Sequence, residues 1–297
     1  MSGAFDVTVF GSANLDVVVR AERHPAPGET VLGRQLAEHP GGKGLNQAVA
    51  ASRSGARVAF VGALGADPAG AGLAEVLAAE GIDHRHVATS DVPTGRAIIV
   101  VDDRGENTIV VVPGANGTVE PPAALPAAKV VLAQLEVPLP AVAGALREAR
   151  AAGALTVLNP APAAALPDEI LAWCDIVVPN EHEVALLGGA EHLLARGVRA
   201  VIVTLGGRGA EVVTPDGTTR IDPHPVTPVD TTGAGDAFCG SLCARLAAGD
   251  ELLAAARWAA VAGALATTAA GAVPAQPTAA AIEAAQARSS TAAQPSS

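Results

Sequence analysis

The residues best suited to chemistry are an aspartate and two glycines at the start of a predicted helix. Asp236 follows Gly233 and Gly235, and the apolar residues after it recur at i, i+4 and i+8. A helix start presents unpaired N–H groups and the positive end of the dipole, which attract an anion such as phosphate. Asp236 could simply cap this helix. It could also be a general base that takes a proton from an alcohol attacking the phosphate, and the surrounding glycines and threonines favour this second role.

Other polar residues follow predicted buried strands at the point where each strand ends. Asn14 and Asp16 come after the apolar run 5–10, and similar positions later in the chain hold Glu136, Asn159, Asn180 with Glu183, and Thr204. Open α/β sheets bind ligands at the carboxyl edge of their strands. Asn14 and Asp16 are therefore candidates for holding hydroxyl groups, although an Asx turn would also explain them.

A glycine-rich segment with a lysine, residues 41–44, invites comparison with a phosphate-binding P-loop. Gly44 stands where a P-loop has the serine or threonine that binds magnesium, so this comparison fails. What remains is a flexible backbone that carries Lys43 and Asn46 into a predicted helix ending near Ser54. Such a segment could pack closely around a small polar ligand, or it could simply be the turn that leads into the helix.

The order of elements predicts an α/β fold with a mostly parallel central sheet and helices on both faces. The predicted strands and helices alternate; strands lie at 5–10, 57–61, 130–135, 155–158, 176–178 and 200–204, and helices around 73–77 and 139–146. Short strands at 17–19, 30–36, 94–101 and 107–112 predict a small separate sheet. Because these strands come from two distant stretches, about 14–38 and 93–112, we expect a discontinuous β lid on one domain spanning 1–283. The Ala, Ser, Gln and Pro-rich residues 284–297 are expected to be disordered.

Composition narrows the class of partner. The chain of 297 residues has 19 basic and 30 acidic residues and a net charge of −11, which argues against nucleic acid or an anionic membrane. Residues 1–6 show no basic segment followed by an apolar core, so no secretory signal is expected, and the apolar segment 258–273 falls short of a membrane span. The three cysteines fit a reducing cytoplasm, and Cys239 and Cys243 are expected to be small core residues. The seven histidines show no zinc-site spacing.

Seven short motifs, in order and extending to about Pro277, resemble the ribokinase family of sugar kinases. They are Gly11–Asp16, Gly41–Ala50, Gln134–Glu136, Asn159–Pro162, Asn180–Glu183, Thr204–Gly209 and Asp230–Asp236. The resemblance implies a ribokinase-like fold and ATP-dependent phosphorylation of the primary hydroxyl of a small sugar, with D-ribose favoured and ribose 5-phosphate as the product. It also implies a homodimer formed through the lid.

The resemblance assigns a role to each matching position. Asp236 would be the base, and Gly233, Ala234 and Gly235 would form the anion hole. The sugar would be held by Asn14, Asp16, Gly42, Lys43, Asn46, Glu136 and Asp236. ATP would contact Asn180, Thr204, Leu205, Gly206, Gly207, Arg208, Gly209 and Gly235. Glu183 would organise Mg²⁺ through water, and an activating K⁺ would be bound by Asp230, Thr232, Ala266, Ala269 and Gly271.

Three positions depart from the family pattern. Ala260 stands where a polar residue is often found near the adenine, which leaves the nucleotide preference open. Ala275 replaces a serine of the cation site, so a weaker response to K⁺ is expected. The segment 187–198 is shorter than expected, as if part of a helix were missing.

Three alternatives are weighed against a sugar kinase acting on ribose, deoxyribose or fructose: a nucleoside kinase of the same fold, and two proteins of other classes. A nucleoside kinase would need an aromatic surface for the base, and the chain has four Phe, two Trp and no Tyr. A non-catalytic sugar sensor on the same fold would have no need of Asp236. A nicotinamide dehydrogenase is disfavoured because residues 11–14 read Gly-Ser-Ala-Asn and lack the Gly-x-G-x-x-Gly fingerprint.

Overall fold

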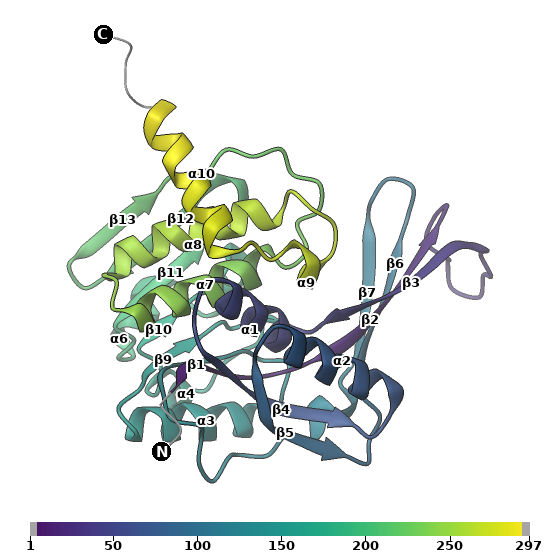
Figure 1. Ribbon diagram of the computed structural model, residues 1–297, viewed down its shortest axis with the longest axis horizontal. Coiled ribbons are helices and arrows are strands. Elements are labelled where there is room, and N and C mark those ends of the chain that lie inside the picture. The colour runs from purple at the N-terminus through teal and green to yellow at the C-terminus, as the bar shows by residue number, and fades with distance from the viewer. Residues whose placement is uncertain (1–4, 293–297) are drawn as a thin grey trace.

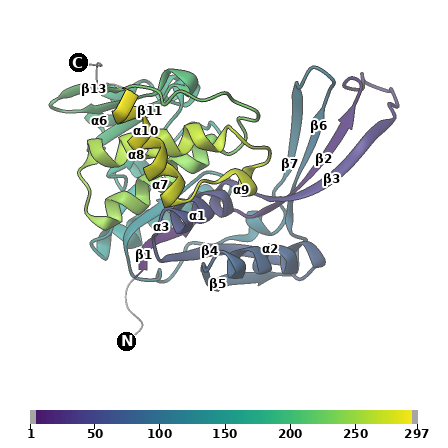
Figure 2. The same ribbon diagram turned by 45° about the horizontal axis from the view of Figure 1, so that its top comes forward.

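A nine-stranded sheet forms the centre of the protein, and a separate four-stranded sheet projects from it (Figures 1 and 2). The computed structural model describes residues 5–292. The large sheet has the order β13-β12-β11-β10-β9-β8-β1-β4-β5. Its strands are β1 (Phe5–Phe10), β4 (Val58–Gly65), β5 (Asp83–Ser90), β8 (Ala128–Ala133), β9 (Leu155–Leu158), β10 (Ile176–Val177), β11 (Ala200–Thr204), β12 (Ala210–Thr214) and β13 (Gly217–Ile221).

The first seven of these strands pair in parallel, and β12 and β13 add to β11 as antiparallel edge strands. The predicted mostly parallel sheet is confirmed. The sequence did not indicate β5, β12 or β13, because each has polar residues along its exposed face and so lacks the continuous apolar run of a buried strand.

Helices cover both faces of the sheet. They are α1 (Lys43–Arg53), α2 (Pro68–Ala79), α3 (Leu139–Ala151), α4 (Asp168–Leu171), α5 (Glu181–Leu186), α6 (Ala190–Ala195), α7 (Ala234–Ala248), α8 (Leu252–Ala266), α9 (Ala272–Ala275) and α10 (Ala279–Ala292), with 3₁₀ turns η1 (Gly114–Thr118) and η2 (Gly206–Arg208). Alternate residues of each central strand enter different cores: Val7 and Val9 pack under α1 and α7, whereas Phe10 packs toward α3. The alternation explains why these strands are apolar throughout.

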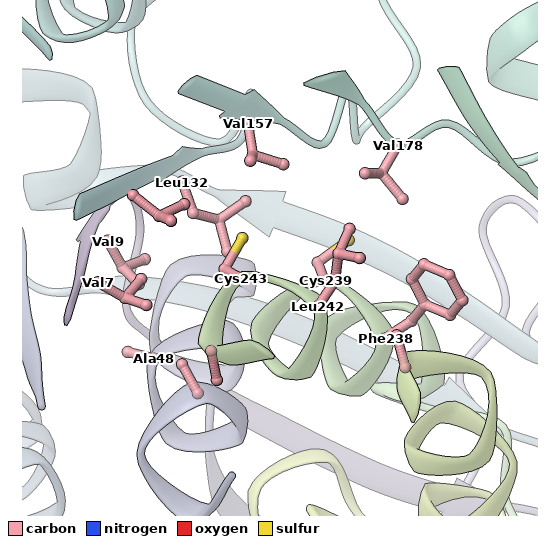
Figure 3. Close-up of a cluster of buried hydrophobic side chains, with 14 of the residues drawn as sticks. Val7, Val9, Ala48, Leu132, Val157, Val178, Phe238, Cys239, Leu242 and Cys243 are labelled. Atoms are coloured by element: carbon pink, nitrogen blue, oxygen red, sulfur yellow. The ribbon is translucent and has the colours of Figure 1, made fainter. Parts of the chain in front are cut away.

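The core beneath α7 fixes the position of this helix on the sheet. Phe238, Leu242 and the thiols of Cys239 and Cys243 point toward valines and leucines of the central strands (Figure 3). The predicted core role of both cysteines is confirmed. Burial of a side chain such as Leu242 contributes about 1.5–3 kcal/mol to stability, so the start of α7 is anchored close to the carboxyl edge of the sheet.

The predicted lid exists as a four-stranded sheet of order β3-β2-β6-β7. It comprises β2 (Asn14–Ala21), β3 (Gly33–Gly41), β6 (Gly95–Val101) and β7 (Asn107–Val112). Two boundaries differ from the sequence prediction. Asn14 and Asp16 belong to β2 and not to a loop, because their backbones pair with β3 and β6 on both sides. Strand β3 begins three residues later than expected and continues to Gly41.

The predicted disordered tail is wrong for residues 284–292, which belong to α10. Alanine has the highest helix propensity of the amino acids, and this helix buries Ile282 and Ala285 against Trp258, Val261 and Ala262 of α8. Residues 293–297 lie outside the described part of the chain. Within residues 5–292, no helix combines the length and the apolar character needed to cross a membrane.

Candidate active site

The topological switch of the large sheet lies at β1, because the chain runs outward from this strand in both directions. The first crossover leads from β1 to β4, and the later strands continue on the other side from β8. Ligands of open α/β sheets bind outside the strand ends at such a point. Here the Ser12 hydroxyl after β1 donates a 2.5 Å hydrogen bond to Glu136 Oε2 after β8, and the Lys43 backbone N–H donates to the same oxygen at 3.0 Å.

Asp236 faces this edge from α7. The N-cap of α7 is Gly233, with φ 76°, and its left-handed backbone turns the chain into the helix. Asp236 is the third residue of the helix and is buried, so the hypothesis that it caps the helix is wrong. Its carboxylate instead accepts one hydrogen bond on each oxygen, from Asn46 Nδ2 to Oδ2 and from Gln47 Nε2 to Oδ1, both at 2.9 Å.

A pocket of about 250 Å³ opens in front of this carboxylate. Seven of the predicted site residues line it together with five others; the full lining is Lys43, Asn159, Ala161, Val178, Asn180, Glu183, Thr204, Thr231, Gly233, Gly235, Asp236 and Cys239. The pocket thus joins the glycine-rich start of α7, the lysine of α1 and the ends of β9, β10 and β11. A phosphate ester placed there would meet both backbone N–H groups and a cation.

The charges around the pocket are strongly coupled. The pKa of Lys43 is raised, and the negative charge of Asp236 is the largest cause. Burial of Lys43 lowers its pKa in part, whereas the charges of Glu136 and Glu183 raise it further. Burial raises the pKa of Asp16 to about 7, and the negative charges of Glu136 and Asp236 add to the effect. Lys43 is therefore held as a cation among carboxylates, whereas Asp16 titrates near neutral pH.

Asn14 lies at the base of the lid and is oriented by Asn116, a residue to which the sequence gave no role. Asn116 Nδ2 donates to Asn14 Oδ1 at 2.7 Å and to the Ala13 carbonyl at 3.1 Å, while its Oδ1 accepts the Ala13 N–H at 3.0 Å. Since the oxygen of Asn14 is taken, its NH₂ group is left to donate to a ligand. Gly95 makes room for this arrangement, because a Cβ there would lie 2.3 Å from both amides.

Asn180 and Glu183 form a reciprocal capping box at the start of α5. The Asn180 side chain accepts from the Glu183 N–H, and Glu183 Oε2 accepts from the Asn180 N–H, both at 2.8 Å. Glu183 is buried, which raises its pKa, although Asn180 and Lys43 lower it in part. One carboxylate oxygen of Glu183 is thus engaged by the cap while the side chain lines the pocket.

The glycine-rich turn after β11 sits beside this box. Thr204 pairs with Asn180 in an isolated parallel bridge. The turn η2 follows, and the residues on either side of it are joined by a 2.9 Å hydrogen bond from the Leu205 N–H to the Gly209 carbonyl. Of residues 204–209, Thr204 lines the pocket. The Arg208 guanidinium pairs with Glu181 of α5 and so ties the turn to the capping box.

The predicted cation residues lie on the loop before α7 and on the segment from the end of α8 to the start of α9, and hydrogen bonds join these two segments. Asp230 Oδ1 accepts from the N–H and hydroxyl of Thr232 at 2.9 and 2.7 Å, and Oδ2 accepts from the Gly271 N–H at 2.9 Å. Burial raises the pKa of Asp230, but these bonds outweigh it and lower the pKa overall. The Asp230 N–H also donates to the Thr267 carbonyl, which lies between Ala266 and Ala269. The Asp230 carboxylate is thus held in its ionised form beside these segments, and carboxylate and carbonyl oxygens are the ligands that hard cations prefer.

Comparison with known proteins shows the family to which the chain belongs. The family described as pfkB family carbohydrate kinase matches residues 4–279. The chain belongs to this family. The kinase is 42% identical over 260 residues to a bifunctional ribokinase/ribose-5-phosphate isomerase A of Fructilactobacillus sanfranciscensis; the match covers 81% of the kinase and 48% of that longer relative.

A ribokinase of Staphylococcus aureus is 39% identical over 260 residues, which cover 81% of the kinase and 86% of the relative. Among solved structures, Arabidopsis thaliana ribokinase complexed with ribose and ATP superimposes with a TM-score of 0.87 at 30% identity, covering 95% of the kinase and 99% of that chain. The α/β fold with a separate lid sheet and the ribokinase-type, ATP-dependent phosphorylation of a sugar predicted from the sequence are confirmed.

The sequence missed several polar residues of the kinase that hold the site in place. They are Ser12, Gln47, Asn116 and Gln134, of which all but Asn116 stand inside the motifs that carried the family resemblance. Strand-end position was a usable signal for Ser12 and Gln134, as it was for Asn159. Asn116, in the run Pro-Gly-Ala-Asn-Gly, looked like an ordinary turn residue.

The three positions that depart from the family pattern all lie in helical parts of the kinase. Ala260 is partly buried on α8 and packs against the main core, and Ala275 is buried in α9. The segment 187–198 forms the six-residue helix α6, and its Leu193 is fully buried against the sheet. The short helix therefore still covers this part of the sheet.

Proposed function

We propose that the protein is a ribokinase that transfers the γ-phosphoryl group of ATP to the primary hydroxyl of D-ribose and releases ribose 5-phosphate and ADP. The observation that carries the proposal is the Asp236 carboxylate. It is buried in the first turn of α7, held by Asn46 and Gln47, and faces a pocket lined by Lys43 and the glycine-rich helix start. A carboxylate placed in this way can accept a proton from an alcohol beside a phosphate.

The proposed reaction needs little covalent chemistry from the protein. The sugar hydroxyl loses its proton to Asp236 as its oxygen bonds to the γ-phosphorus, and the bond from this phosphorus to the bridging oxygen breaks to leave ADP. The backbone N–H groups of Gly233, Ala234 and Gly235 and the Lys43 cation stabilise the charge on the transferred group.

Two groups of residues are proposed to hold the sugar. Asn14 and Asp16, from the lid strand β2, would bind the ring hydroxyls from one side. Gly42, Lys43, Asn46 and Glu136 would bind them from the body of the protein. Asn46 is suited to this task because its Nδ2 is used on Asp236 while its buried Oδ1 has no partner among the described residues. A sugar hydroxyl would satisfy that oxygen.

The ATP side is proposed to comprise Asn180 and the residues 204–209. Glu183 would organise Mg²⁺ through water, since its buried carboxylate lines the pocket beside Asp236. Bound magnesium supplies neutralising charge to the phosphates in reactions of this type. Because Ala260 is small and apolar, the nucleotide preference is expected to be less strict than in kinases with a polar residue there.

A monovalent cation is proposed beside the anion hole, held by Asp230, Thr232, Ala266, Ala269 and Gly271. The hydrogen bonds between the two loops support this placement. We expect activation by K⁺ over Na⁺, weakened because Ala275 offers no hydroxyl. Initial rates in K⁺, Na⁺ and a bulky organic cation test it, and equal rates in all three would remove the cation from the mechanism.

A homodimer through the lid is also proposed. The edge strand β7 exposes consecutive apolar residues from Ile109 to Val112; Ile98 is exposed on the adjacent strand β6, and Leu36 on the opposite edge strand β3. An exposed apolar edge strand favours association with another chain. Light scattering after size exclusion should give twice the chain mass, and Val111→Lys should give monomers.

A coupled assay of ADP formation with Mg²⁺ tests the main proposal. D-ribose is expected to give the highest kcat/KM in a panel with deoxyribose, fructose and common nucleosides, and the product should carry its phosphate on the primary carbon by NMR. Background rates with every acceptor would refute the kinase proposal. A clear preference for deoxyribose or fructose would change the substrate but keep the chemistry.

A further inference from the structure

A chain of buried side-chain amides runs behind Asp236 from Gln134 through Gln47 to Asn159, and of these three residues Asn159 also lines the pocket. Gln134 Nε2 donates to Gln47 Oε1 at 2.6 Å. Gln47 Nε2 donates to Asp236 Oδ1 at 2.9 Å and to Asn159 Oδ1 at 3.0 Å. Asn159 Nδ2 in turn donates to the Val178 carbonyl at 2.9 Å. Gln47 and Gln134 have no exposed surface, so neither can exchange these partners for water.

The direction of every bond in this chain follows from its backbone end. The Val178 carbonyl can only accept, so Asn159 must point its NH₂ group there and its oxygen toward Gln47. Gln47 therefore faces two acceptors, Asn159 Oδ1 and Asp236 Oδ1, and it has two N–H groups to satisfy them. Its own oxygen then faces Gln134, which presents an NH₂ group.

This arrangement restricts the Asp236 carboxylate. Gln47 holds Oδ1 and its chain neighbour Asn46 holds Oδ2, both from α1. Two donors at separate oxygens fix the plane of the carboxylate, and charge-assisted bonds of this kind are shorter and stronger than neutral ones. Asn46 also lies where the sugar is proposed to bind. Gln47 does not, because it is fully buried behind Asp236.

We propose that Gln47 is a positioning residue for phosphoryl transfer, and that Gln134 keeps its amide the right way round. Gln47 would act by holding the Asp236 carboxylate at the angle from which it takes the proton of the attacking hydroxyl. The inference rests on the proposed role of Asp236 as the base. A role of this kind affects the rate of the chemical step and leaves the binding of sugar and ATP unchanged.

The test compares two variants of Gln47 with a matched control. Gln47→Met keeps the length of the side chain but removes both donors, and Gln47→Glu keeps the shape but replaces the NH₂ group with an acceptor. The control is Ser241→Ala, which removes the buried 2.9 Å bond between the Ser54 and Ser241 hydroxyls at the same interface of α1 and α7. For each variant kcat, both KM values and the Kd of the sugar by calorimetry are measured.

Gln47→Met is expected to lower kcat by about 10- to 100-fold, in line with the cost of misplacing a catalytic group. Gln47→Glu should be at least as slow, although its shape is closer to glutamine. Both KM values and the sugar Kd should stay within about threefold of the parent, and Ser241→Ala should keep the parent kcat.

Several outcomes would overturn the inference. These are a kcat within about threefold of the parent for Gln47→Met, a glutamate variant that recovers activity, or an equal loss in Ser241→Ala. Should neither Gln47 variant fold, Gln134→Met decides: it touches neither Asp236 nor the pocket, so a lowered kcat at constant KM supports the inference and an unchanged kcat refutes it. An inactive parent would instead refute the proposed function.

Discussion

Gly240 of α7 lies directly against the backbone of Gln47 in α1, and a Cβ on Gly240 would come within 2.3 Å of the Gln47 carbonyl oxygen. Gly240 stands four residues after Asp236, one helical turn further along the same face. The missing side chain lets the two helices approach until the short amides of Asn46 and Gln47 reach the Asp236 carboxylate. Close helix packing and the geometry of the proposed base thus depend on one residue.

Gly240→Ala is therefore expected to lower both stability and activity. The added methyl group would meet backbone atoms, which cannot move aside without shifting a helix, and such overpacking costs about 1–3 kcal/mol. Thermal unfolding should show a lower Tm. The fold-change in kcat should be larger than the fold-change in the KM for sugar. Gly72→Ala is the matched control, because no atom lies within 4 Å of a Cβ at that position of α2. An unchanged Tm and kcat for Gly240→Ala would mean that the interface of α1 and α7 can accommodate the extra methyl group.

The variant Asp236→Asn tests whether Asp236 acts as the general base. As a helix cap the change would be silent, but Asp236 receives two amide donors and caps nothing. An asparagine must turn its NH₂ group toward one of these donors, so we expect a lower Tm as well as a kcat reduced by about 10²–10⁴-fold. Asp216→Asn, on an exposed turn, should change neither.

Calorimetry and initial rates on the same preparations check this expectation. A kcat close to that of the parent in Asp236→Asn, at any Tm, would exclude Asp236 as the base. A lower Tm is the result expected from the loss of a good partner for the Asn46 or Gln47 amide, and a lower kcat is the result expected from the loss of the base.

The sequence predicted much of this architecture because apolar runs and polar strand ends are local signals. The runs at 130–135, 155–158 and 200–204 correspond to β8, β9 and β11, and the residues after them meet at one edge. The polar strands β5, β12 and β13 could not be identified in this way. Their place in the sheet depends on the pairing of β5 with β4, of β12 with β11 and of β13 with β12, and not on an apolar pattern of their own.

The supporting contacts of the site were beyond the sequence for a related reason. Gln47 and Asp236 are 189 residues apart, and Asn116 and Asn14 are 102 apart. Such bonds depend on the packing of α1 against α7 and of η1 against β2, which no local pattern records. The helix α10 was missed because low sequence complexity resembles disorder, although its alanines favour a helix and Ile282 has a partner core.

Asn116 offers a test of how Asn14 is oriented. Asn116→Asp keeps the acceptor for the Ala13 N–H but loses the donor to Asn14 Oδ1, so the Asn14 amide would turn over and face the sugar with its oxygen. The KM for sugar is expected to rise about 10-fold or more, since a mismatched buried pair costs about 1–3 kcal/mol. The KM for ATP should hardly change. Asn107→Asp, at an exposed position of β7, is the control.

The outcome to compare is the ratio of the two KM values. An equal rise for sugar and ATP would point to a general loosening of the lid base, and no rise for either would mean that the orientation of Asn14 is unimportant.

Asp16 makes stability depend on pH in a direction that can be measured. Burial, with Glu136 and Asp236 nearby, raises the pKa of Asp16 from 3.8 to about 7. Between these two values the folded protein binds a proton that the unfolded chain has lost, so unfolding becomes easier as pH rises from about 4 to about 7. The contribution is complete below the unfolded pKa and is lost once pH has passed the folded pKa.

Asp16→Asn removes this titration while keeping the size of the side chain. At pH 8 the folded parent holds an ionised Asp16 beside two other carboxylates, so the variant should melt at a higher temperature than the parent. At pH 5 the Asp16 of the folded parent is largely protonated, and the gain in Tm should be much smaller. Thermal melts of both proteins without ligand at pH 5, 6, 7 and 8 give the comparison. A gain in Tm that is the same at every pH would show that Asp16 does not titrate in this range, and that its environment is more solvated than its burial indicates.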